Sequence, residues 1–149
     1  MNKTLQKSYA IGLTLILVAL TAPLLLARQD EQPPPPIVQH MRHINQNLRT
    51  LRGQFDQSAM QAENLRLVEA IRSDVRAAEK LQPLKTPQIP AEQREAFLKN
   101  YRAELEEVVD TLDQLEGALK KNDTDTAKTL ILKLNDIKRE GHQRFKSPD

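Results

Sequence analysis

The stretch FLKNYRAELEEVVDTLDQLEGAL, residues 97–119, decides the fold class of this 149-residue chain. Its apolar residues recur every three or four positions, which is the period of an amphipathic α-helix and not that of a strand. They form the longest apolar stripe in the sequence: Phe97, Tyr101, Leu105, Val108, Leu112, Leu115 and Leu119. No other stretch carries a competing strand pattern, so the sequence predicts an all-α protein.

Proline positions divide the rest of the chain into two long blocks that permit helices. No proline occurs in residues 37–82 or 91–147. Three prolines lie between the blocks: Pro83, Pro87 and Pro90. Each block is longer than a usual globular helix and holds a central turn signal, at residues 53–58 and 122–125. We therefore expect four helices with short connections, packed as an antiparallel up-down-up-down four-helix bundle.

The expected helix starts have their own signals. Pro36 precedes the first helix, and Ser58 with Gln61 has the spacing of a capping box for the second. Pro90 suits the first position of the third helix, and Asp123 is a good N-cap for the fourth. The bundle itself should begin near Ile37.

Residues 1–27 have the composition of an export signal. Lys3 and Lys7 precede an apolar run over residues 10–27 that contains no charge. The run is also close to the minimum length that spans a bilayer, so the segment is either a removed signal peptide, which we favour, or an uncleaved anchor. Either outcome exports the remainder, with the periplasm as the expected location and residues 1–27 as the only expected membrane contact. Residues 28–36 end in four prolines and predict a stiff spacer before a domain over residues 37–149.

Composition excludes several classes of chemistry. The chain has no cysteine, so disulfides, thiolate metal sites, covalently attached c-type haem and cysteine nucleophiles are ruled out. From Arg28 onward basic and acidic residues are equal in number, which argues against nucleic-acid binding. No phosphate loop, nucleophile elbow or His-Glu-x-x-His motif indicates an enzyme. The acidic residues of the third helix are expected to form a solvated face and not a di-iron site: Glu104, Glu106, Glu107, Asp110 and Asp113.

Two polar residues interrupt the apolar stripe of the fourth helix. Lys138 falls within the stripe and His142 at its edge, when successive residues are placed 100° apart. In this topology the end of the fourth helix lies beside the start of the first, where Met41 is central in its own stripe. Taken separately, Met41 is a core filler and the polar pair belongs to a frayed last turn. Together, a thioether and an imidazole from facing helices suggest the two axial ligands of a haem iron.

Other residues near this end leave alternatives open. A bare zinc or copper ion would need more protein ligands than two. His40, at the edge of the first stripe, is either a rival ligand or an exposed polar residue at a helix start, whereas His43 points away from the stripe. Gly141 either gives a flat macrocycle room beside the helix or weakens its last turns.

Two motifs resemble the soluble cytochrome b562 family of periplasmic four-helix haem proteins. Met41-Arg42-His43-Ile44-Asn45-Gln46-Asn47-Leu48 is similar to the family's opening helix, and His142-Gln143-Arg144-Phe145-Lys146 to its closing sequence. The resemblance covers essentially residues 37–146, although outside the two motifs it is mostly one of pattern.

The resemblance implies one non-covalent haem b per chain, with Met41 and His142 as axial ligands. It also implies apolar walls for the haem: Ile44, Leu48, Val108 and Ile137. Lys138 and Lys146 would pair with the propionates as point charges, the former where the family commonly has arginine. The family's paired aromatics of the third helix are replaced by Glu104 and Val108, with Tyr101 one turn away.

The implied function is one-electron transfer by a monomeric carrier that is not an enzyme, because both axial positions are filled by protein. Its expected partners are redox proteins of the periplasm. Four basic residues near this end serve either as a docking patch or as partners of the helix dipole: Arg42, Arg139, Arg144 and Lys146. The competing function is a haem-free periplasmic four-helix adaptor or stress-related binding protein.

Overall fold

The computed structural model describes residues 33–146 and confirms the expected all-α, sequentially antiparallel bundle. The helices are α1 (Pro36–Gln54), α2 (Gln61–Glu79), α3 (Arg94–Lys120) and α4 (Thr124–Phe145). Three short 3-10 turns lie in the connections: η1 (Ser58–Met60), η2 (Thr86–Gln88) and η3 (Ala91–Gln93). The expected export segment, residues 1–27, lies outside the described residues. Within residues 33–146, no helix combines the length and the apolar character that a bilayer span needs.

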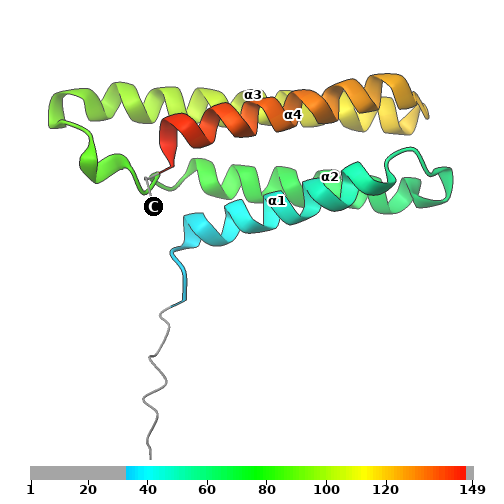
Figure 1. Ribbon diagram of the computed structural model, residues 1–149, viewed down its shortest axis with the longest axis horizontal. Coiled ribbons are helices and arrows are strands. Elements are labelled where there is room, and N and C mark those ends of the chain that lie inside the picture. Colours follow the sequence, from blue (N-terminus) through cyan, green and yellow to red (C-terminus); the bar gives the residue numbers. More distant parts are fainter. Residues whose placement is uncertain (1–32, 147–149) are drawn as a thin grey trace, which may run out of the picture. The chain divides into compact units, whose positions relative to one another are not determined.

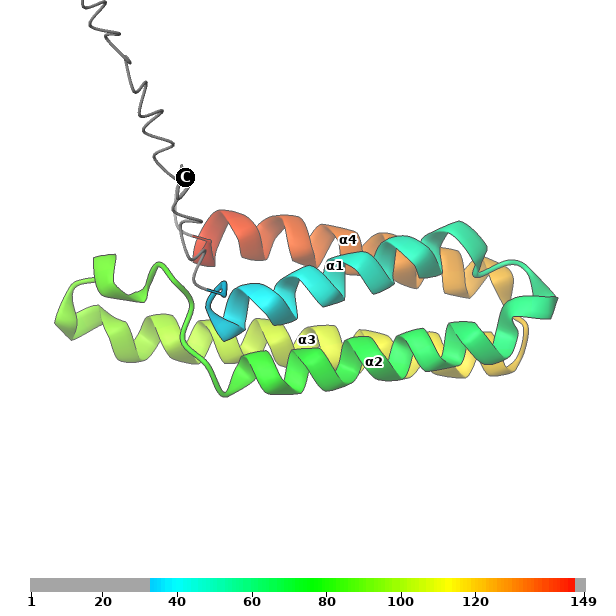
Figure 2. The same cartoon turned by 90° about the horizontal axis from the view of Figure 1, so that it is seen from below.

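The helices pack in chain order, and one of the four seams is sparse. α1 packs along α2, α2 along α3 and α3 along α4, whereas α1 and α4 make few contacts. α1 and α2 form one layer and α3 and α4 the other (Figure 1). α1 begins and α4 ends at the same end of the bundle in both views (Figures 1 and 2). The first and last motifs of the sequence are therefore brought together at this end.

The core follows the stripes that the sequence predicts. On α3 the residues from Tyr101 to Leu119 in the stripe are buried, except Val108, which like Phe97 is half-buried against the core. The largest side chains with almost no exposure come from all four helices: Leu51, Ile71, Leu112, Leu115 and Ile131. Burial of such aliphatic side chains is the main term that stabilises a bundle of this size.

Two of the helix starts proposed from local signals are confirmed, since α1 begins at Pro36 and Asp123 precedes α4. Asp123 caps α4, since its carboxylate accepts hydrogen bonds from the Thr126 amide at 3.1 Å and the Thr126 hydroxyl at 2.7 Å. The Ser58 capping box is wrong, because Ser58 opens a 3-10 turn and makes no side-chain cap. The Gln61 amide instead donates to the Leu119 carbonyl at 2.9 Å, which ties α2 to the end of α3.

Pro90 also departs from the expectation. It precedes η3 with an extended ψ of 142°, and α3 begins only at Arg94. The Arg94 guanidinium donates to the Ile89 carbonyl at 2.8 Å, so the proline-bearing connection folds back on the first turn of α3.

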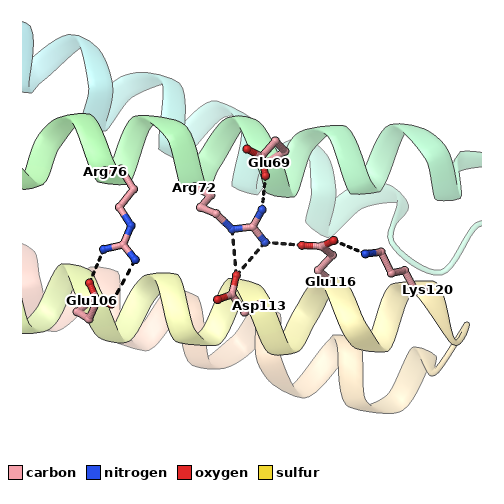
Figure 3. A network of polar contacts seen from close by, with 7 residues as sticks. All are labelled: Glu69, Arg72, Arg76, Glu106, Asp113, Glu116 and Lys120. Atoms are coloured by element: carbon pink, nitrogen blue, oxygen red, sulfur yellow. Dashed lines mark hydrogen bonds and ion pairs between the residues drawn. The ribbon is translucent and has the colours of Figure 1, made fainter.

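A network of ion pairs joins the outer faces of α2 and α3 (Figure 3). Arg72 contacts Asp113, 2.9 Å away, together with Glu69 and Glu116, and Glu116 also contacts Lys120. One turn further along α2, Arg76 binds Glu106. Exposed pairs contribute little each, about 0–1 kcal/mol, so the network orients two helices that the apolar core already holds together.

We expect the apolar seam between these helices to dominate stability. Leu112→Ala leaves a cavity in the centre of the bundle and should lower the free energy of unfolding by about 3 kcal/mol. Leu132→Ala is the matched control, because Leu132 is 56% exposed, and it should cost less than about 0.5 kcal/mol. Urea unfolding of the purified chain, followed by far-ultraviolet circular dichroism, measures both. Equal costs would contradict this account of the core.

Candidate functional site

The sparse seam between α1 and α4 contains a cavity of about 410 Å³. It lies at the end where α1 begins and α4 ends, and it is lined from all four helices. All eight residues that the sequence analysis assigned to the site line this one cavity: Met41, Ile44, Leu48, Val108, Ile137, Lys138, His142 and Lys146. The bundle therefore brings together positions that lie up to about a hundred residues apart in the chain.

The cavity walls are mostly apolar. Leu48 and Ile137 are buried, and Ile44 and Val108 are half-buried against the core. Ile71 and Val75 of α2 add two buried residues that the sequence analysis did not assign to the site. A concave apolar surface with a few polar groups at its edge is the usual form of a site for a large flat ligand.

Met41 and His142 approach this cavity from facing helices. Met41 is half-buried on α1 and packs against the core, and His142 lies on α4 with an exposed side chain. Desolvation lowers the pKa of His142, and the charges of Lys138 and Lys146 lower it further. The neutral imidazole, which is the form that binds metal ions, is thereby favoured at neutral pH.

His40 and His43 are engaged elsewhere. The Nδ1 atom of His40 lies 2.7 Å from an Asp74 carboxylate oxygen on α2, and that of His43 lies 3.7 Å from the same atom. Neither histidine lines the cavity. His40 is therefore a cross-helix partner of Asp74, which differs from both roles considered for it in the sequence analysis. Among residues 33–146 no group of three His, Asp or Glu side chains is placed to hold a metal ion.

The last turns of α4 do not fray, because an aromatic cluster holds them. Phe145 is 8% exposed and its ring centroid lies 5.2 Å from that of Phe97 and 5.4 Å from that of Tyr101. The Lys85 ammonium also donates to the Arg144 carbonyl at 3.0 Å. His142 is thus carried by a packed helix. Tyr101 lies one turn before position 104, and Phe97 lies one turn before Tyr101, so the aromatic residues of α3 precede the positions aligned with the family's pair.

Glu104 departs from the expected solvated acidic face. Its side chain is 8% exposed and lines the cavity, unlike Glu106, Glu107, Asp110 and Asp113, which are exposed. An Arg144 guanidinium nitrogen lies 3.0 Å from Oε2, although this oxygen accepts no hydrogen bond within the described chain. Desolvation raises the pKa of Glu104, and the nearby Arg144 charge only partly opposes the rise.

Gly141 leaves room for the Glu104 carboxyl group in its present position. A Cβ atom at position 141 would lie 2.4 Å from the Glu104 Oε1 atom, which is closer than real Cβ atoms approach other atoms. The room that the missing side chain leaves beside α4 is therefore filled by a carboxyl group of α3. This role was not among the two considered for Gly141 from sequence.

An apolar cavity inside a four-helix bundle, with a thioether and an imidazole at its edge and cations on its rim, is the kind of site that helical haem proteins use. The cytochrome b562 family model matches residues 37–146, and the chain belongs to the cytochrome b562 family. The family consists of haem-binding electron carriers, typically without enzymatic activity. No curated protein and no solved structure matches the chain significantly.

Burial of Glu104 predicts a specific pH dependence of stability. Because its pKa is raised in the folded chain, the folded state binds this proton more tightly than the unfolded state does. The contribution of Glu104 to the free energy of unfolding therefore falls as the pH rises from about 4.5 through the raised pKa. Glu104→Gln removes this fall, so the variant should gain stability relative to the parent as the pH rises. Urea unfolding of the haem-free chains over a pH series measures the difference.

Glu106→Gln is the control with the opposite sign. Hydrogen bonds from Arg76 lower the pKa of Glu106. The parent should therefore gain stability relative to this variant as the pH rises from the lowered pKa to about 4.5. A difference between the parent and Glu104→Gln that stays constant with pH would disprove the assignment of a destabilising buried carboxylate.

Proposed function

We propose that this chain binds one haem b non-covalently and carries single electrons in the periplasm, with Met41 and His142 as the axial ligands. The single observation that carries the proposal is the cavity, which has both candidate ligands on facing helices and an apolar lining. Membership of the cytochrome b562 family over residues 37–146 supports the same cofactor. The periplasmic location is supported by the composition of residues 1–27 and by the family.

The residues present fit such a cofactor. A neutral imidazole nitrogen and a thioether sulfur are suitable donors for low-spin iron, and methionine ligation favours a high reduction potential. When bound, the haem supplies the one-electron couple between ferrous and ferric iron. The apolar walls exclude water and disfavour the additional positive charge of the ferric state. Lys138 and Lys146, on the rim, offer ammonium groups to the propionates.

The proposed ligation also explains why the proposed function is transfer and not catalysis. With both Met41 and His142 holding the iron, no coordination position would be left for a substrate. Electrons then have to leave through the exposed edge of the site. A monomer with one such edge, serving periplasmic redox proteins, is the proposed working form.

Optical spectra of single variants test the ligands. The reconstituted parent should show low-spin haem bands in both oxidation states, and Met41→Ala or His142→Ala should lose them. Haem affinity should also fall by more than about tenfold, since changes at residues that only support metal ligands already cost about 10–100-fold. Met60→Ala and His43→Ala are matched controls, because neither residue lines the cavity. Both control variants should keep the spectrum of the parent.

Three outcomes distinguish the possibilities. Absence of any Soret band in the reconstituted parent would favour the haem-free adaptor. A haem spectrum that survives both ligand substitutions unchanged would show that haem binds with other ligands. A change in Met60→Ala equal to that in Met41→Ala would show that the effect is not specific to ligation.

A further inference from the structure

α1 carries a row of positive charges without compensating acids. Its three arginines are Arg42, Arg49 and Arg52, and no acidic residue occurs between Pro36 and Gln54. Spacings of seven and three residues place them on one side of the helix, next to Asn45, which lines the cavity. None of the three has a carboxylate within 4.0 Å in the described part of the chain.

The facing helix adds a fourth unpaired cation. Lys138 of α4 is half-buried, and no carboxylate of residues 33–146 forms an ion pair with it. Burial lowers the pKa of Lys138, and the charges of Arg52 and Arg49 lower it further, so the three side chains share one region. Arg42 and Lys138 both line the cavity. We call this surface, made of Arg42, Arg49, Arg52 and Lys138, the basic face.

Elsewhere on the bundle, several cations that connect helices are paired with acids. On α2, Arg66, Arg72 and Arg76 all have carboxylate partners, and the last two bridge to α3 (Figure 3). α3 itself carries seven acidic residues against four basic ones. α1 therefore carries positive charge without any acid of its own, whereas α3 carries an excess of acids.

The basic face differs from the patch considered in the sequence analysis. Arg139 lies 2.9 Å from Asp136, and Arg144 lies 3.0 Å from Glu104 and 3.2 Å from Glu140. Acids of the chain itself thus compensate these two arginines. Arg49 and Arg52 take their place, which the sequence pattern did not indicate because their lack of partners depends on the packing of α1 against α4.

We propose that the basic face is the docking surface for an electron-transfer protein with an acidic surface. This proposal rests on the proposed function, since the partner is the protein that exchanges electrons with the haem. A positive region attracts an acidic surface at long range and sets its orientation on contact. Because two of its four residues also line the cavity, a partner bound there lies next to the edge through which electrons leave.

The chemistry of the surface favours a protein over a nucleic acid or a lipid. The described part of the chain has only two large hydrophobic residues that are well exposed, Leu84 and Leu132, and neither lies on α1. Insertion into a lipid surface normally uses such residues together with basic ones. The balanced charge from Arg28 onward gives no general attraction for a polyanion. Four neighbouring cations, two of which line the cavity, suit a local acidic patch.

The test uses a gold electrode with a carboxylate-terminated monolayer as a probe for an acidic protein surface. The haem-free chain should adsorb to this monolayer, as measured with a quartz crystal microbalance, and adsorption should weaken as NaCl is raised, because salt screens exposed charges. It should adsorb poorly to a hydroxyl-terminated monolayer. Arg49→Glu combined with Arg52→Glu should weaken adsorption by about tenfold or more.

The matched control changes the same net charge on the diagonal helix. Lys99→Glu combined with Arg102→Glu alters two exposed cations of α3 and should weaken adsorption by less than about twofold. Circular dichroism should show the same helix content in both double variants. Equal effects of the two double variants would overturn the proposal, since adsorption would then follow net charge alone.

The loaded chain separates this proposal from the haem proposal. Voltammetry of the parent should give faster electron transfer on the carboxylate monolayer than on the hydroxyl one, and the α1 double variant should lose the difference. Equal rates of electron transfer on both monolayers would refute the proposed docking surface and leave the haem proposal intact. Lack of a wave on either surface would refute the haem proposal, while adsorption of the haem-free chain still reports on the basic face.

Binding to phosphatidylglycerol vesicles or to single-stranded DNA, without adsorption to the carboxylate layer, would overturn the proposal in favour of a lipid or a nucleic acid.

Discussion

The incomplete contact between α1 and α4 is the constraint on which the rest of the structure depends. Three seams of the bundle are filled by aliphatic side chains that are almost completely buried, and they are sufficient to fix the topology. The fourth seam is left partly open, so apolar residues such as Ile44 and Val108 remain half-buried around a cavity. A ligand that covers this surface binds only the folded chain and therefore stabilises it. The packing that determines the fold therefore also determines the site.

The support of the site differs from what the cytochrome b562 family pattern implies. Aromatic residues are present, but they act at the end of the bundle, where Phe97 and Tyr101 clamp Phe145 and keep the last turns of α4 ordered. In the wall itself, the carboxyl group of Glu104 lies against Gly141, next to the proposed ligand His142. In the proposed haem site, the ferric state would favour a buried carboxylate at this position, whereas the apolar surroundings disfavour it. The carboxyl group of Glu104 can thus carry a charge in the cavity wall, which an aromatic ring at the same place could not.

Periodicity was sufficient to predict the helices, their order and the meeting of Met41, Lys138 and His142 at one end, because each depends on which side of a helix a residue occupies. The other five positions around the cavity followed from the resemblance to the cytochrome b562 family. The burial of Glu104 could not be found in this way, since an acidic residue is normally assigned to the solvated face. A signal was nonetheless present, because position 104 lies three residues after Tyr101 and four before Val108, on the same arc. The helix starts at Ser58 and Pro90 were wrong because 3-10 turns precede α2 and α3, and such turns are set by packing of the connections and not by the local residues alone.

Charge placement gives a physical reason why the fourth seam stays open. Ion pairs cross from α2 to α3 and from α3 to α4, as in the pairs of Arg72 with Asp113 and of Lys133 with Glu107, which lie 2.9 Å and 3.3 Å apart. Across the seam from α1 to α4 the charges that face each other are all positive, so no ion pair can draw these helices together. Repulsion between like charges instead opposes closure, and it weakens when anionic groups enter the region. The same arrangement that keeps the cavity accessible therefore favours negatively charged groups at its rim, whether they belong to a bound cofactor or to a docked protein.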